Sequence, residues 1–378
     1  MAPWTVHRAT APATPDDAAM WAVTGASRAH ADTHRSLFGY PDAAWQAPEV
    51  AALLRERPYE RSTLLVATAD GARHEADAVV GAALVNVPTQ DNPHLAVAES
   101  WVRPDVRGRG VGTALLDAVE AAARAEGRRT LIVMSTHRAP ADGTPTAVSR
   151  SGTGAVPALD AATRLAAARG YGLEQVERFS TFAFPLDDER RAVVRRAHDD
   201  AARAAGDAYR LVAWTGPTPD AHLDQMAVLR TRMSTDVPTA DLQVEEEPWD
   251  AERVRAHDRE VVEQGRVAAV VAAQHVPSGD LVAFTVVEWP PTLPEVAYQQ
   301  DTLVVAAHRG HRLGMLVKTA QLLRLEDLWP GLRRLHTWNA QENDHMLAIN
   351  VALGFTPTGV LGMWQRDLDG GGRERPVV

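Results

Sequence analysis

Three glycines alternate with two arginines and a valine in the run Arg107-Gly108-Arg109-Gly110-Val111-Gly112. The segment 95–102 before this run has the pattern of a strand, and the segment 111–123 after it has the pattern of an amphipathic helix. Glycines at a strand-to-helix junction expose backbone N–H groups, and the positive end of the helix dipole points toward the same place. We therefore expect this first glycine loop, residues 107–112, to bind a phosphate or pyrophosphate group.

Two known phosphate loops fit the first glycine loop poorly. In the dinucleotide fingerprint Gly-x-Gly-x-x-Gly the third glycine stands one position later than Gly112, and no βαβ unit opens this chain. The Walker loop needs Gly-Lys-Ser/Thr, whereas Gly112-Thr113 lacks the lysine. A glycine-rich turn without a ligand is the remaining alternative, and the agreement of strand, loop and helix disfavours it.

A second glycine loop, residues 309–314, repeats the first at a constant spacing. Gly310 follows Gly108 by 202 positions without a gap, and Arg312 stands where the first loop has Gly110. The other pairs at this spacing are Arg107 with Arg309, Gly112 with Gly314, Val102 with Val304, and Glu99 with Asp301. Because an acidic residue precedes both loops, a role for it in chemistry gains support.

The sequence around each loop has the same order of elements. Each half begins with a strand-like run and a helical stretch, the latter at 16–31 and 220–233. Two strand patterns then precede the strand that leads into the glycine loop. This predicts a mixed α/β fold present twice. We expect an N-terminal domain at 1–187, a linker or helix at 188–207 and a C-terminal domain at 208–378. The polar stretch 139–157 is expected to be a disordered insertion, with a mobile lid as the alternative.

Composition excludes several classes of function. The chain has 378 residues, a formal net charge of −10 and no cysteine, which removes disulfides, thiolate metal sites and a cysteine acyl-enzyme. The acidic balance argues against nucleic acid as a partner, and no apolar run approaches the length of a membrane span. We expect a cytoplasmic protein, and the alanine- and arginine-rich composition is typical of a GC-rich bacterial genome.

The pattern Arg-x-x-Gly-x-Gly, filled by Arg107, Gly110 and Gly112, resembles the acetyl-CoA loop of the GNAT acyltransferase superfamily. The run from Trp338 to Phe355, with Asn339, Asn343 and Asn350, is similar to a cofactor-binding helix and strand of that family. The resemblance implies two tandem GNAT folds, an architecture shared with mycothiol synthase, although no motif assigns that activity. It also implies acetyl-CoA or another acyl-CoA as the cofactor.

The resemblance implies roles for individual residues. A backbone N–H near Val102 or Val304 would stabilise the oxyanion. Glu99 and Asp301 are the candidate catalytic bases, with a paired or solvated carboxylate as the alternative for both and binding of a cationic substrate as a further alternative for Asp301. The predicted cofactor-binding residues are Val102, Arg107, Gly108, Arg109, Gly110, Val111, Gly112, Thr113, Val304, Arg309, Gly310, His311, Arg312, Leu313, Gly314, Asn339, Asn343 and Asn350.

The general acid departs from the family pattern. Many GNAT enzymes have a tyrosine four residues before a Gly-aromatic pair, where this chain has Ala166 and Asn350. Tyr171 is expected to pack. His308 and His311 lack a nearby carboxylate, so we expect no metal site.

We therefore expect an acetyl-CoA-dependent N-acyltransferase in which the amine of a small molecule attacks the thioester directly. The alternative is a degenerate tandem module that binds acyl-CoA without turnover. Acyl transfer from a carrier protein or from aminoacyl-tRNA is a third possibility, and the net charge disfavours the tRNA form. The sequence leaves the oligomeric state open.

Overall fold

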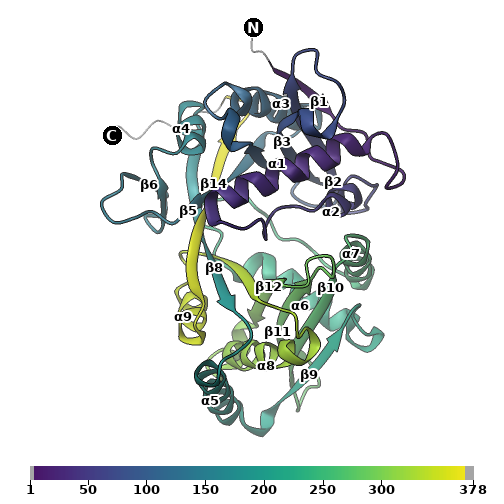
Figure 1. Ribbon diagram of the computed structural model, residues 1–378. Coiled ribbons are helices and arrows are strands. Elements are labelled where there is room, and N and C mark those ends of the chain that lie inside the picture. Colours follow the sequence, from purple (N-terminus) through teal and green to yellow (C-terminus); the bar gives the residue numbers. More distant parts are fainter. Residues whose placement is uncertain (1–3, 371–378) are drawn as a thin grey trace. The chain divides into compact units, whose positions relative to one another are not determined.

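The computed structural model describes residues 4–370, which form two compact units (Figure 1). Unit 1 contains the described residues up to Glu177, the segment Thr239–Val244 and the residues from Gly359 onward. Unit 2 contains Arg178–Pro238 and Glu245–Thr358. Residues 1–3 and 371–378, which the predicted domains 1–187 and 208–378 include, lie outside the described residues.

Unit 1 is built on a mixed sheet. Its strands, in spatial order, are β1 (Trp4–Arg8), β2 (Glu60–Ala69), β3 (Val79–Pro88), β4 (Leu95–Val102), β5 (Thr130–Arg138) and β14 (Thr356–Asp367). Neighbouring strands are antiparallel except β4 and β5, which are parallel. A parallel pair needs a crossover connection, and the helix after the first glycine loop supplies it.

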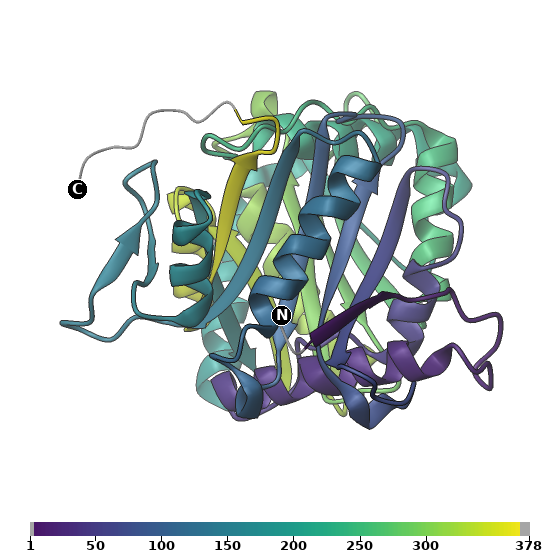
Figure 2. The ribbon, with the colours of Figure 1, turned by 90° about the horizontal axis from the view of Figure 1, so that it is seen from above.

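Helices cover both faces of this sheet. They are α1 (Met20–Phe38) and α2 (Ala47–Leu53) on one face and α3 (Val111–Ala125) and α4 (Ala161–Ala168) on the other. Leu64 and Val66 of β2 pack with α1 and α2, whereas Leu65 and Ala67 pack on the α3 side, as the two-residue period of a strand requires. Figure 2 shows α3 lying over one face of this sheet, with its axis roughly along the strands.

Unit 2 repeats this plan. Its strands, in spatial order, are β8 (Gly172–Ala183), β13 (Arg334–Ala340), β12 (Val296–Val304), β11 (Leu281–Trp289), β10 (Val267–His275) and β9 (Tyr209–Thr215). Of β8, only the part from Arg178 onward belongs to unit 2, and the part up to Glu177 belongs to unit 1. Its helices are α5 (Asp188–Ala205), α6 (Leu223–Asp236), α7 (Ala251–Glu263), α8 (Leu313–Leu328) and α9 (Asp344–Leu353). The order β10, β11, β12, α8, β13 corresponds to β2, β3, β4, α3, β5, so the predicted repeat is present in the fold.

The compact units are not contiguous in sequence, whereas the predicted domains are. β14, the last strand of the chain, enters unit 1 at Gly359 and pairs antiparallel with β5 from Arg138 to Thr130. The helix α5, which lies in the predicted linker 188–207, belongs to unit 2, because Val194 and Ala201 pack in the same core as Leu322 of α8.

The stretch 139–157 is ordered, so its interpretation as a disordered insertion is wrong. It folds into a hairpin of β6 (Thr146–Val148) and β7 (Ala155–Pro157) with three antiparallel residue pairs. Val156 is fully buried in the core on the α3 side and anchors the hairpin there. Burial of the apolar Val156 side chain stabilises the hairpin, although the prediction of disorder rested on the polar composition of the segment.

Short 3₁₀ turns complete the chain: η1 (Ala76–Ala78), η2 (Pro104–Val106), η3 (Gly206–Ala208), η4 (Asp220–His222) and η5 (Ala306–His308). In the part of the chain that the structure describes, every helix is too short or too polar to cross a bilayer.

Candidate functional site

The first glycine loop adopts the backbone conformation that its glycines predict. Gly108 and Gly110 have φ of +76° and +89°, in the left-handed region that glycine adopts without strain. Gly110 is the N-cap of α3, so no side chain stands between the first N–H groups of this helix and an incoming anion. Gly112 serves packing instead, since a Cβ there would lie 3.3 Å from Leu165 of α4.

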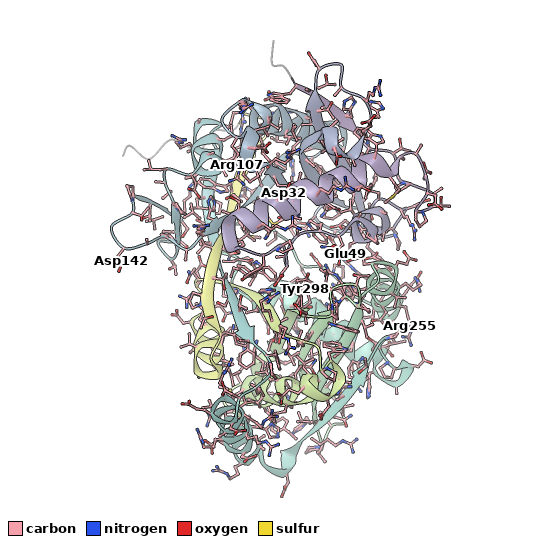
Figure 3. All side chains as sticks on the ribbon, viewed as in Figure 1. Asp32, Glu49, Arg107, Asp142, Arg255 and Tyr298 are labelled. Atoms are coloured by element: carbon pink, nitrogen blue, oxygen red, sulfur yellow. The ribbon has the colours of Figure 1, made fainter. Side chains whose placement is uncertain are left out.

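Arg107 connects this loop to the end of β4. Its Nε donates to the carbonyl of Val102 at 3.1 Å, and Thr33 Oγ1 of α1 donates to the same carbonyl at 3.3 Å. Trp4 Nε1 donates to the carbonyl of Arg109 at 2.7 Å. The loop is thus held on both sides (Arg107 is labelled in Figure 3). Burial lowers the pKa of Arg107 while the charge of Asp160 opposes this, and the guanidinium remains charged.

Strands β4 and β5 separate beside the loop. Their parallel pairing runs from Leu95 with Thr130 to Glu99 with Met134 and ends there. Beyond this point β4 stays paired with β3 as far as Val102, and β5 stays paired with β14 as far as Arg138. Each strand therefore follows its outer neighbour, and the backbone at the inner edges of the opening faces space that a ligand can enter.

A cavity of about 540 Å³ connects the loop with this opening. The predicted site residues that line it are Glu99, Val102, Arg107, Gly108, Gly110, Val111, Gly112 and Thr113. The structure thus brings the candidate base and the first glycine loop to one cavity.

The carboxylate of Glu99 is held by hydrogen-bond donors. Trp45 Nε1 donates to Oε2 at 2.8 Å, and His30 Nε2 lies 3.5 Å from Oε1. Burial by itself raises the pKa of Glu99. The charge and hydrogen bond of His30, the hydrogen bond from Trp45 and the charge of His34 outweigh burial and lower this pKa to about 2. Glu99 is therefore ionised at neutral pH.

Two histidines of α1 extend this contact. His34 Nε2 lies 3.0 Å from His30 Nε2, and the backbone N–H of Trp45 donates to His30 Nδ1 at 3.2 Å. Nε2 of His30 thus faces both the Glu99 carboxylate and the His34 ring, and an N–H at this position can donate to Glu99. The sequence interpretation missed this pair, although the spacing of four residues on a helix places both rings on one face.

Three further polar residues that the interpretation missed line the cavity on the α4 side: Ser135, His137 and Asp160. His137 Nε2 lies 2.7 Å from Ser135 Oγ, and His137 Nδ1 lies 2.7 Å from Asp160 Oδ2. The indole N–H of Trp364 on β14 donates to Ser135 Oγ at 2.8 Å. Their only sequence signal is the alternation of Ser135 and His137, which puts both on one face of a strand.

The second glycine loop keeps one contact of the first and changes its N-cap. Arg309 Nε donates to the carbonyl of Val304 at 3.3 Å, as Arg107 does to Val102. Gly310 has φ of +89°, but the N-cap of α8 is Arg312 with φ of +56°. A side chain in the left-handed region costs roughly 1–2 kcal/mol. Leu313, the first residue of α8, is buried in the core of unit 2.

Asp301 has a different environment from Glu99. Its Oδ2 lies 2.5 Å from Arg230 Nη1, and the Arg230 guanidinium lies 5.4 Å from the ring centroid of Trp249. The predicted alternative for Asp301, a paired carboxylate, describes this geometry, and its role as a base stays a prediction.

The three asparagines of the predicted cofactor helix lie in unit 2. Asn343 Oδ1 accepts from the backbone N–H of Met346 at 3.2 Å and caps α9, and Asn350 Nδ2 donates to Asn339 Oδ1 at 2.7 Å. His311 packs against Tyr209 with ring centroids 5.3 Å apart. Binding of a cofactor by these residues stays a prediction.

Comparison with known proteins supports the resemblance. The model of the GNAT acetyltransferase family matches residues 30–142, a segment that includes Glu99 and the first glycine loop. None of the curated protein sequences matches the chain significantly.

Three solved structures share the fold. A tandem GNAT protein from the clavulanic acid biosynthesis pathway, solved without acetyl-CoA, has a TM-score of 0.70 and 24% identity, with 97% of this chain and 98% of that chain covered. A GCN5-related N-acetyltransferase from Sphaerobacter thermophilus has a TM-score of 0.57 and 14% identity, with 100% and 97% covered. A glucosamine N-acetyltransferase region of a fungal multi-domain β-N-acetylglucosaminidase has a TM-score of 0.55 and 13% identity, with 97% and 38% covered.

The mixed α/β fold class and the tandem arrangement predicted from the sequence are confirmed by the fold of these structures. Residues 30–142 thus match the model of the GNAT acetyltransferase family, and the chain has the fold of a tandem GNAT protein.

Proposed function

We propose that unit 1 transfers an acetyl or other acyl group from acyl-CoA to the amine of a small molecule, which attacks the thioester directly. The observation that carries this proposal is the single cavity shared by the first glycine loop, the opening between β4 and β5, and Glu99. Acyl transfer in general follows from the family, and the acyl donor, the amine and the residues are the parts proposed here.

The first glycine loop fits the pyrophosphate of CoA. The left-handed glycines at 108 and 110 and the uncapped start of α3 present backbone N–H groups to an anion. The opening that begins after Glu99 and Met134 fits the pantetheine arm, and a backbone N–H of β4 near Val102 would stabilise the oxyanion of the tetrahedral intermediate.

Glu99 would hold and deprotonate the amine. A carboxylate with a pKa near 2 is a weak base, so its first role is to attract the ammonium form of the acceptor into the cavity. The amine must lose a proton before it attacks, and His30, whose Nε2 lies 3.5 Å from Glu99, connects the carboxylate with a second imidazole at His34. The Glu99 carboxylate is the acceptor proposed for that proton.

We propose that unit 2 has a structural role and does not itself transfer an acyl group from acyl-CoA. Arg312 at the left-handed N-cap of the second glycine loop and the ion pair of Asp301 with Arg230 favour this role over a second active site. This keeps one part of the degenerate-module alternative, for unit 2 alone.

The proposal is tested by measuring CoA release with acetyl-CoA and a panel of small amines. Because the chain has no cysteine, a thiol reagent detects released CoA without a background from the protein. Glu99→Gln is expected to lower kcat/KM by about 10² to 10⁴, and Asp301→Asn, its counterpart in unit 2, by much less. Equal losses in both variants, or no release with any amine, would contradict the proposal.

A further inference from the structure

Ser135, His137 and Asp160 form a chain of hydrogen bonds whose donors and acceptors are arranged as in a nucleophilic triad. His137 is 1% exposed, and its Nδ1 lies 2.7 Å from the Asp160 carboxylate, which can only accept. In the neutral ring Nε2 is then the acceptor, 2.7 Å from Ser135 Oγ. Trp364 Nε1–H already donates to this oxygen at 2.8 Å, so the serine proton is left to point at His137.

The side chain of Asp160 binds His137 and does not cap its own helix. It is the N-cap of α4, where an aspartate usually accepts from a backbone N–H of the first turn and stabilises the helix by about 1 kcal/mol. Its side chain makes no such capping bond and binds the imidazole instead. If His137 only filled space in the core, the loss of the capping hydrogen bond of Asp160 would have no counterpart.

The three residues face the place where a thioester would lie. Ser135 follows Met134, the last β5 residue that pairs with β4, so it stands at the start of the opening between the strands. Ser135, His137 and Asp160 all line the cavity that contains the first glycine loop. Glu99 lines the same cavity from β4, where His30 and Trp45 hold it.

We propose that Ser135 is a nucleophile, activated by His137 and Asp160, that hydrolyses acyl-CoA through an acyl-serine when no amine is bound. The bond from Ser135 Oγ to the acyl carbon forms and the carbon–sulfur bond breaks. His137 Nε2 takes the serine proton and passes it to the departing thiolate, which leaves as CoA. Trp364 Nε1–H donates to Ser135 Oγ and so holds the hydroxyl with its proton toward His137.

Water completes the cycle. His137 Nε2 takes a proton from water as its oxygen attacks the acyl carbon, and the proton returns to Ser135 Oγ when the ester bond breaks. The products are the carboxylic acid and free CoA, so the step needs no other reactant. The inference rests on the proposed binding of acyl-CoA in this cavity, but the activation of Ser135 is a property of the chain alone.

The first test measures that activation without CoA. Ser135→Cys introduces the single thiol of an otherwise cysteine-free chain, so thiolate absorbance against the wild-type protein reports its pKa. The pKa is expected well below the ordinary value of about 8.5. His137→Gln in the same chain should return it to about 8.5 or above. Ser100→Cys, which lines the same cavity from β4, is the matched control.

The second test incubates the wild-type protein with acetyl-CoA and no amine. We expect a mass increase of one acetyl group that maps to Ser135, with steady release of CoA. Ser135→Ala should abolish both, and Asp160→Asn should slow CoA release by on the order of 10³-fold or more.

The outcomes separate the two proposals. An ordinary pKa for the thiol introduced at Ser135 overturns the triad, whatever binds in the cavity. CoA that binds, as calorimetry would show, and is released only with an amine, without acyl-serine, also overturns the hydrolysis and leaves the proposed transfer standing. If CoA fails to bind, the proposed function falls, and so does the hydrolysis of acyl-CoA.

Discussion

Replacing Gly110 by aspartate or by asparagine separates the charge of the first glycine loop from its shape. Both side chains have nearly the same size, and a Cβ at Gly110 has only Trp4 Nε1 nearby, at 4.0 Å. The left-handed φ of +89° strains each residue by roughly 1–2 kcal/mol. Their difference in CoA affinity therefore reports the charge beside the phosphate site.

The charge term has a definite size. Two unit charges about 5 Å apart at an effective dielectric constant of about 20 repel each other by about 3 kcal/mol. We therefore expect Gly110→Asp to bind CoA about 100-fold more weakly than Gly110→Asn. Isothermal titration at low salt measures both affinities, and thermal unfolding checks that the two variants are equally folded.

The same pair at Gly310, which also has φ of +89°, is the control in the second glycine loop. It is expected to change the affinity little. Equal affinities for the aspartate and asparagine variants at Gly110, with a difference at Gly310, would move the CoA site to unit 2 and refute the assignment.

Three further variants test the charged groups of the two units. The pKa of Glu99 is lowered from 4.5 to about 2. The stability that its carboxylate contributes is therefore complete above pH 4.5 and is lost as the pH falls toward 2. Glu99→Gln should weaken the pH dependence of the free energy of unfolding in that window, and an unchanged dependence would refute this. Burial lowers the pKa of Lys318 from 10.5 to about 7. The free energy of unfolding therefore falls by about 1.4 kcal/mol per pH unit as the pH falls from 10.5 to 7. Lys318→Met should remove this pH dependence and raise the Tm at neutral pH, and a lower Tm would contradict the prediction. Asp301→Asn leaves the half-buried Arg230 without its carboxylate and should lower the stability by about 1–3 kcal/mol in denaturant unfolding; full stability with lost acyl transfer would make Asp301 a base instead.

The local features of the fold were predictable because they depend on short-range rules. Left-handed glycines at 108 and 110, the strand before them and the helix after them follow from residue type and periodicity. The repeat also revealed the equivalent loop at 309–314.

Long-range pairing was not predictable from the same rules. Sequence periodicity predicts where a strand lies but not which strand it pairs with. It therefore does not predict that β14 enters unit 1 and pairs with β5, a strand far away in the chain. The predicted helix 16–31 ends before His34, whereas α1 extends to Phe38, so the histidine pair beside Glu99 was missed. Trp364 reaches Ser135 across 229 positions, a contact that only the folded sheet creates.

The central claim is that acyl-CoA binds in the cavity of unit 1, and a structure of the protein with CoA tests it most directly. We expect the pyrophosphate at the first glycine loop, the pantetheine arm between β4 and β5, and the sulfur between Glu99 and Ser135. CoA bound at the second glycine loop alone would contradict the account.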